Sequence, residues 1–350
     1  MIISYLFLFC FLFGVFSFLM NVLQDPKGVH NPLLTLQNIS VTNSEVEGIF
    51  CLNGDGMIGQ QVSLRLERLK LENIPQMTYI WVASKISVNL QHLTTLKIIG
   101  CAKLKVIFPP SVLRSLPELK ELIIKECMEL KQIVGCEQGA PNNSLIFSNL
   151  QELEIIGCAK LEVIFSKYDL RCLPILSIVK IRKCKELRVI IEEDVEDKKM
   201  SNLLSPQSFF PKLKALYVGH CHKLKRFISG SASNDFPNLY LLIISGASEL
   251  EEFVGRGQGK SDEIGKTKIE LPRIKVLIFT HLSNFNQEIE LPNLKNCVVY
   301  ECPKLSLTPT TTLEKLMKDI SGKYYISLQI NYFIQTRLFQ ISNRVFTNFF

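Results

Sequence analysis

The sequence predicts an α/β solenoid: a horseshoe of stacked units with a parallel β-sheet on its concave side and irregular or short helical returns on its convex side. Two observations predict this fold. The phrase LxxLxIxxCxxLxxIF recurs through most of the 350 residues, most clearly in two neighbouring copies, NLQHLTTLKIIGCAKLKVIF and SLPELKELIIKECMELKQIV. Within the phrase, the apolar spacing changes from two to three, which indicates a short strand followed by a return.

Each part of the phrase has a physical reason. Leu96 and Ile98 alternate with other residues, as expected for a short strand with one buried face. Cys101 and Leu104 then follow at a spacing of three, which suits an irregular or short helical return. One such unit cannot bury its own apolar face, so neighbouring units must stack and share a continuous core.

The phrase can be followed in order along the chain. The first copy, between Leu36 and Phe50, is degraded and one residue out of step, and the register becomes clear at Leu66. The Cys position of the following units is taken by Ile74, Cys101, Cys127, Cys158, Cys184, Cys221, Ala247, Leu282 and Cys302. Longer intervals between these positions contain polar inserts at 135–144, 192–208 and 255–270, which we expect in exposed loops.

Six of the eleven cysteines occupy this one position, where the chain turns away from the strand. A small buried residue fits there, and a thiol is a weak donor that is usually buried, so we predict inert, reduced thiols. No CxxC pair occurs that would favour a zinc or redox site. In His220-Cys221-His222, strand neighbours should point to opposite faces, so we predict no metal site.

The chain divides into three segments at the level of sequence. Residues 2–23 carry no charge and are long enough to span a bilayer, so residues 1–24 are a membrane anchor, a signal peptide or an artefact of the gene prediction. Residues 33–308 contain the repeats. Residues 309–350 leave the pattern: Thr311 and Glu314 form a capping box for a short helix ending at Gly322, and a capping strand or a further artefact follows.

The sequence gives no support for catalysis or for nucleic-acid binding. The net charge is +7, without a long Lys/Arg run and with one tryptophan, so no nucleic-acid partner is predicted. The five histidines lack a nucleophile motif. The nearest approach to a phosphate-binding loop, between Gly259 and Thr267, has five residues between its glycines, where the motif needs four. We therefore predict a non-enzymatic protein with no cofactor.

The phrase and its lead-ins, Phe210-Pro211-Lys212-Leu213 and Phe236-Pro237-Asn238-Leu239, resemble the C-terminal leucine-rich repeats of plant disease-resistance proteins of the coiled-coil nucleotide-binding class. The resemblance covers residues 33–308. It implies a cytoplasmic protein-binding domain that recognises a pathogen effector or a guarded host protein. In that family the repeats also restrain a nucleotide-binding module. The sequence contains none, so the resemblance implies that such a module would act from another chain.

Two other interpretations stay open. A leucine-rich-repeat substrate adaptor of a ubiquitin ligase usually has CxxIT or CxxLS units after an F-box-like helical domain, and neither feature is present. An extracellular receptor fragment is favoured only by the apolar residues 2–23, which would also allow membrane attachment. Its usual GxIP signature and paired capping cysteines are missing.

The binding surface is expected on the concave side, at the strand positions that flank the buried pair of each unit. These positions mix charged, tyrosine and aliphatic side chains, a combination that suits a protein interface. The candidate residues are Lys97, Ile99, Glu121, Ile123, Lys125, Glu152, Glu154, Lys180, Arg182, Tyr217, Ile243, Thr280, Val298 and Tyr300.

Overall fold

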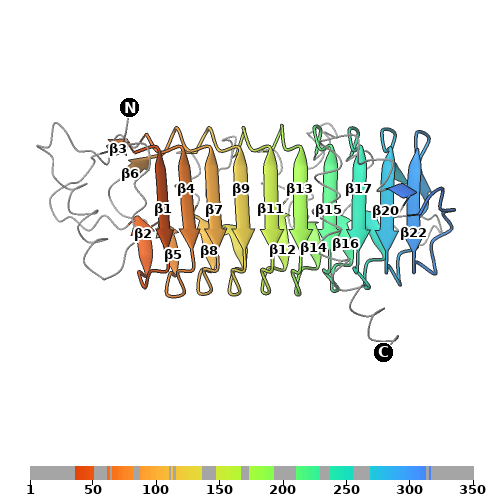
Figure 1. The fold of residues 1–350 in the computed structure, drawn as a ribbon, viewed down its shortest axis with the longest axis horizontal. Helices are drawn as coiled ribbons and strands as arrows, with labels where there is room; N and C mark the ends of the chain where they lie inside the picture. The colour runs from red at the N-terminus through yellow and green to blue at the C-terminus, as the bar shows by residue number, and fades with distance from the viewer. Residues whose placement is uncertain are drawn as a thin grey trace, which may run out of the picture.

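The computed structural model describes residues 36–50, 61–63, 65–81, 87–109, 112, 116–135, 147–166, 173–192, 210–228, 236–254, 269–312 and 315–316. These residues form a solenoid of parallel strands (Figure 1), which confirms the predicted fold class. One long sheet contains ten strands, one per unit, lying across the long axis of the molecule. In spatial order they are β1 (Asn38–Thr42), β4 (Arg68–Glu72), β7 (Thr95–Ile99), β9 (Glu121–Lys125), β11 (Glu152–Ile156), β13 (Ile178–Arg182), β15 (Ala215–Gly219), β17 (Leu241–Ser245), β20 (Val276–Thr280) and β22 (Asn296–Tyr300).

The strands of the long sheet pair with equivalent positions in register. Leu96 of β7, for example, lies between Leu69 of β4 and Leu122 of β9. The degraded first unit obeys the same register, because Ile39 pairs with Leu69. In the return of the first unit, Phe50 pairs with Trp81, which lies 31 residues later, whereas Ile39 pairs with Leu69, which lies 30 residues later. The predicted slip of one residue therefore lies between the strand and the return.

The returns are more regular than predicted, because many of them contain short parallel strands. β2 (Gly48–Phe50) pairs with β5 (Tyr79–Trp81), and β8 (Val106–Phe108) pairs with β10 (Gln132–Val134). A four-stranded sheet follows, with β12 (Val163–Ser166), β14 (Val189–Glu192), β16 (Arg226–Ile228) and β18 (Glu252–Val254). Two smaller pairs join β3 (Gln61–Ser63) to β6 (Ser87–Asn89) and β19 (Ile269–Glu270) to β21 (Ile289–Glu290).

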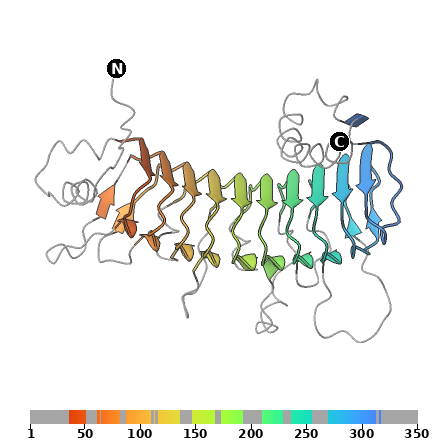
Figure 2. The ribbon, with the colours of Figure 1, turned by 60° about the horizontal axis from the view of Figure 1, so that its bottom comes forward.

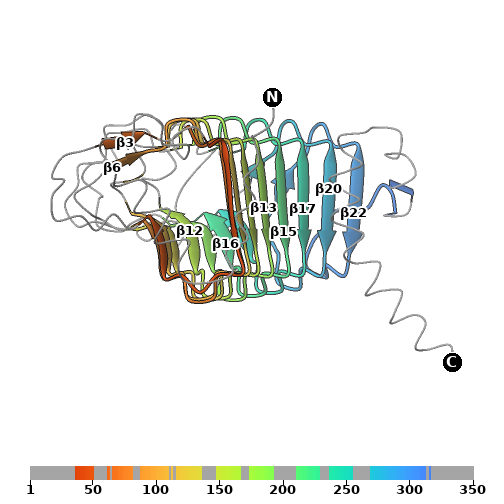
Figure 3. The ribbon, with the colours of Figure 1, turned by 60° about the vertical axis from the view of Figure 1, so that its left-hand side comes forward.

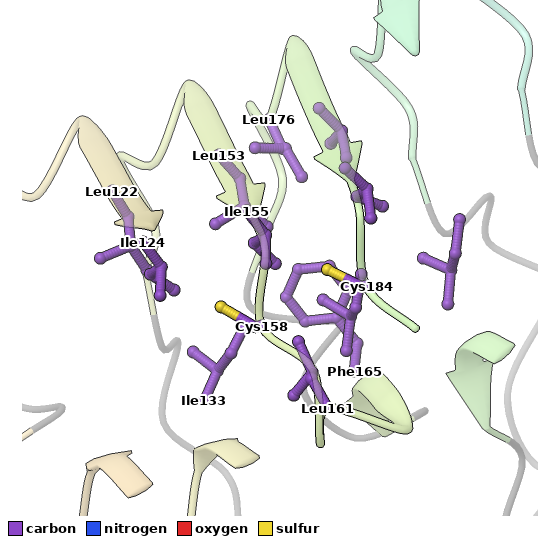
Figure 4. Packing of buried hydrophobic residues seen from close by; sticks show 14 of the residues in the cluster. Leu122, Ile124, Ile133, Leu153, Ile155, Cys158, Leu161, Phe165, Leu176 and Cys184 are labelled. Atoms are coloured by element: carbon purple, nitrogen blue, oxygen red, sulfur yellow. The ribbon is translucent and has the colours of Figure 1, made fainter. Parts of the chain in front are cut away.

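The long sheet and most of the short strands form two layers with the core between them, whereas β3 and β6 lie apart from the other labelled short strands (Figure 1). The stack curves gently, with the long sheet on its concave side and the short strands on the convex side (Figure 2; Figure 3 shows the layers from one end). In the close view of Figure 4, Leu153 and Ile155 point from β11 towards Leu161 and Phe165 of the return. Each such leucine, when fully buried, contributes about 1.5–3 kcal/mol of apolar transfer free energy.

Aromatic side chains from successive units also stack along the core. Phe108 lies 6.3 Å from Trp81 and 5.2 Å from Phe147, measured between ring centroids. Phe253 lies 4.8 Å from Phe227 and 5.0 Å from Phe285. These separations fall within the range of favourable aromatic pairs, so the rings add contacts between the units that carry them.

A left-handed residue follows every strand of the long sheet. Its φ angle is positive at Asn43, Asn73, Gly100, Glu126, Gly157, Lys183, His220, Gly246, His281 and Glu301. The N–H of this residue continues the ladder: Gly100 N donates to Lys125 O at 2.8 Å, and Gly157 N donates to Arg182 O at 2.8 Å. This conformation makes the sharp turn between strand and return, one residue before the Cys position.

The Cys position lies directly after this turn and points into the core. Cys101, Cys127 and Cys158 are fully buried, and the Cys127 thiol donates to Lys125 O at 3.5 Å. The neighbouring thiols of Cys101 and Cys158, together with burial, raise the pKa of Cys127 well above its ordinary value. The seven described cysteines are free, and a buried thiol whose pKa is raised, as at Cys127, is a poor nucleophile.

The segment that follows Pro309 lies beyond β22, the last long strand. A helical turn begins there, but Thr312 caps it: its hydroxyl accepts a hydrogen bond from Lys315 N at 3.3 Å, and Leu316 N donates to Thr312 O at 2.9 Å. The expected cap, Thr311, lies one residue too early. Residues 1–24, residues 323–350, Glu314 and most of the polar inserts lie outside the described residues.

Replacing Gly157 with Ala tests the left-handed turn. Its φ is +70°, and an added Cβ would find its nearest neighbour at an ordinary 3.5 Å, so the backbone conformation alone sets the cost. We expect a loss of about 1 kcal/mol of unfolding free energy, measured by urea denaturation. Glu126→Ala, at the same position of the preceding unit, is the control and should be nearly neutral. Equal losses in both variants would contradict this account.

Site-resolved labelling with iodoacetamide tests the buried thiol column. We expect Cys127 to stay unlabelled at pH 8 in the folded protein and to react completely in denaturant, because it is fully buried and its pKa is raised. Cys302 belongs to the unit of the last long strand and is 8% exposed, so it should react before Cys127 as the protein is destabilised. Rapid labelling of Cys127 in the folded protein would refute the inert-thiol interpretation.

Candidate functional site

The concave face of the long sheet consists of the first, third and fifth residues of each long strand. In β7, Leu96 and Ile98 are fully buried in the core, whereas Thr95, Lys97 and Ile99 lie half-buried on the opposite face. All the candidate residues occupy concave-face positions, so the alternation located them on one surface. Their participation in binding stays a prediction.

The candidate residues differ in how much of each side chain solvent reaches. Half-buried residues are Lys97, Ile99, Glu121, Lys125, Glu152 and Lys180, and Tyr300 is exposed. Buried residues are Ile123, Glu154, Arg182, Tyr217, Ile243, Thr280 and Val298. The second group was expected to be more accessible, and most of it lies toward the C-terminal end of the sheet.

The concave-face residues of β4, β7, β9, β11 and β13, which we call the charged half, carry ion pairs between neighbouring strands. Lys97 Nζ lies 3.8 Å from Glu121 Oε1. Lys125 Nζ lies 3.2 Å from the Glu154 carboxylate, whose side chain is only 8% exposed. Lys180 Nζ lies 2.6 Å from Glu152 Oε1.

Cations and anions therefore alternate across the charged half. The lysines at 97, 125 and 180 each face a glutamate from an adjacent strand, so opposite charges lie side by side. A docking surface must then supply both donors and acceptors, which favours a protein over a nucleic acid.

Isoleucines lie among these charges. Ile99 and Ile156 are half-buried at the ends of their strands, and Ile123 is 7% exposed between Lys97 and Glu154 in the sheet register. Small apolar areas surrounded by charged side chains are typical of protein interfaces. The charged half therefore has the composition of an interface, although much of its charge is internally paired.

The C-terminal strands carry an apolar surface instead, which we call the apolar half. Its residues form a hydrophobic cluster separate from the main core, made of Ile178, Tyr217, Leu241, Ile243, Val276, Ile278, Val298 and Leu316, with Ala215 beside it. All except Leu316 are concave-face residues of β13, β15, β17, β20 and β22. Tyr217 is 3% exposed and Ile243 is fully buried.

Leu316 reaches this surface from a segment that we call the C-terminal strap, of which the structure describes residues 310–312 and 315–316. The strap first pairs with the last long strand: Thr310 N donates to Cys297 O at 2.9 Å, and Cys297 N donates to the Thr310 hydroxyl at 2.8 Å. After the turn capped by Thr312, Leu316 is fully buried in the apolar cluster. The strap thus explains part of the burial of Tyr217 and Ile243.

Sequence reasoning missed several residues of this face. Ile178, Leu241, Val276 and Ile278 occupy the same strand positions as the chosen candidates, so the alternation alone identifies them. Leu316 had no comparable signal, because it lies outside the repeats and only the nearby capping pattern pointed to local order.

A hollow of about 450 Å³ lies near the turns of the last units and is separate from the concave face. Its lining includes His222, His281 and Glu301, and His281 Nε2 lies 3.0 Å from the Glu301 carboxylate. Residues 220–222 lie beyond the end of β15, so the strand alternation predicted for them is wrong. His220 lies in the turn, and its ring is 6.3 Å from that of His222, while Cys221 is buried. Among the described residues, no group of three His, Cys, Asp or Glu side chains is arranged to hold a metal ion.

In the part of the chain that the structure describes, no helix has the length and apolar character needed to cross a membrane. Residues 2–23 lie outside that part.

Comparison with known families found one matching family model. Residues 15–128 and 129–207 match leucine-rich repeats described as plant disease resistance protein RPS2-like, and the two matches together cover more than half of the chain. A search of curated proteins found no match.

A double-mutant cycle on Lys125 and Glu154 measures how strongly the charged half is organised. The Glu154 side chain is 8% exposed and the Lys125 side chain 27%, so solvent screens this pair less than it screens a surface pair. We expect a coupling of about 1 kcal/mol from urea denaturation of the two alanine variants and the double variant. Arg188 and Glu162, both more than half exposed on the convex side, should show no measurable coupling. Equal couplings would contradict the predicted difference.

Proposed function

Because the chain belongs to the plant disease resistance protein RPS2-like leucine-rich-repeat family, we propose that its concave face recognises a pathogen effector or a guarded host protein. The family carries a protein-interaction role in plant immunity, and its repeats are typically non-catalytic. The observation that carries the finer proposal is the charged half, where accessible lysines and glutamates surround Ile99 and Ile123 on one continuous sheet face.

Recognition by this surface would combine two contributions, charge pairing and apolar contact. Lys97 and Glu121 are about one-third exposed and 3.8 Å apart, so each can exchange part of its present interaction for a partner's opposite charge. Ile99 and Ile156 are half-buried among the charges and can be covered by a partner's apolar side chain. The charges set orientation and specificity, and the isoleucines add buried apolar area.

We infer that the protein binds its partner in the cytoplasm. The seven described cysteines are free and several are stacked in a buried column, and free thiols persist in reducing compartments.

Charge reversal on the two sides of the solenoid tests the proposal. The full chain is first screened against panels of pathogen effectors and plant host proteins by split-luciferase complementation. For a partner found in this way, Lys97→Glu with Lys125→Glu should weaken binding at least about tenfold, because two concave-face charges then repel their complements. The affinity is measured by biolayer interferometry with purified protein.

The matched control is Lys105→Glu with Lys131→Glu. These lysines belong to the same two units and carry the same charge, but they are exposed on the return side. The control variant should bind as the unchanged protein does, provided that both variants keep their circular dichroism spectrum and melting temperature. Equal binding by both variants, or a loss only in the control, would show that the partner does not use the charged half.

A further inference from the structure

The apolar half of the concave face is covered from within the chain. Seven residues of its cluster come from five neighbouring strands of the sheet, and the eighth, Leu316, comes from the C-terminal strap. The long sheet separates this cluster from the main core, so the contact is an addition to the repeat fold and not part of its interior.

The contacts of the strap follow one another along the chain. Thr310 pairs with both backbone groups of Cys297 in β22, which lies at one edge of the long sheet. Thr312 then caps a helical turn through Lys315 N. After this turn, Leu316 is fully buried in the apolar cluster, while Lys315 next to it is exposed. Leu316 therefore packs against the sheet, and Lys315 remains in solvent.

The two halves of the concave face therefore differ in what covers them. Tyr217 and Ile243 are buried in a cluster that includes Leu316, whereas the side chain of Lys97, at the equivalent position of β7, is 38% exposed. An uncovered surface of the same aliphatic and aromatic residues would be a typical site of protein association.

We propose that the C-terminal strap occupies the apolar half of the partner-binding face. The strap keeps this half closed, that is, shielded from solvent, and leaves the charged half as the first docking site. A partner that uses the whole face must displace Leu316 and place its own apolar side chain over Tyr217 and Ile243. This inference rests on the proposed function for its purpose, but the closed state of the apolar half can be tested without any partner.

Hydroxyl-radical footprinting of the full chain measures the closed state directly, because side-chain oxidation follows solvent access. In the unchanged protein, Tyr217 should be oxidised at least about tenfold more slowly than Tyr300, which is 58% exposed on the same face. Phe279, fully buried in the main core, provides the slow reference. Oxidation of Tyr217 at the rate of Tyr300 would show an open apolar half and overturn the proposal.

Substitution in the strap then tests whether Leu316 is responsible. Leu316→Asp should raise the oxidation rate of Tyr217 several-fold, because a carboxylate is costly to bury against Ile243 and Ile278. Lys315→Asp, the adjacent exposed position, should leave that rate unchanged. An unchanged rate in Leu316→Asp, or equal rises in both variants, would overturn the proposal.

Phe279 reports in the same experiment whether the fold survives. If Phe279 also becomes reactive in Leu316→Asp, the oxidation rate of Tyr217 is measured instead in Thr312→Ala, which removes the cap without adding a charge. A rise at Tyr217 alone then supports the strap, and no rise contradicts it. Failure of this inference leaves the charge-reversal test of the charged half unaffected, so the two proposals fail independently.

Discussion

The left-handed residue that ends each long strand is the constraint on which the rest of the structure depends. By turning sharply at positions such as Gly100 and Gly157, the chain sends the following cysteine inward and starts the return at the same point in every unit. The N–H of this residue also extends the sheet ladder to the next strand. Equivalent side chains therefore align in columns. The columns that face inward form the core, and those that face outward form the concave face.

Much of this fold can be predicted from the sequence, because each unit repeats the same local physics. Leu96 and Ile98 reveal the strand, and the offset between Ile39 and Phe50 in the first unit reveals a slip that the structure locates in the return. The short strands of the convex side were not predicted. A run such as Val106–Phe108 becomes a strand only when Gln132–Val134 pairs with it, and a periodic pattern within one unit does not contain that information.

The candidate site was predictable to a different extent. Strand alternation identifies which side chains occupy the concave face, from Lys97 through Tyr300. It does not reveal what covers them, because Tyr217 and Ile243 are buried in a cluster with Leu316, which belongs to no repeat. The change from charge to apolar surface occurs at β13, where Ile178 joins the apolar cluster and Lys180 pairs with Glu152. A single sheet thus presents two surfaces with different solvent exposure and different chemistry.

The orientation of the long strands also has a mechanical consequence. Their hydrogen bonds run along the axis of the solenoid, because the strands lie across it (Figure 1). A force that pulls the two ends apart along this axis therefore breaks the hydrogen bonds between one pair of strands at a time. It does not shear all the strands together. At one end, the hydrogen bonds between Thr310 and Cys297 fasten the strap to β22, so tension applied through the strap would load this contact first. The molecule would yield gradually under tension, beginning with the segment that covers its apolar half.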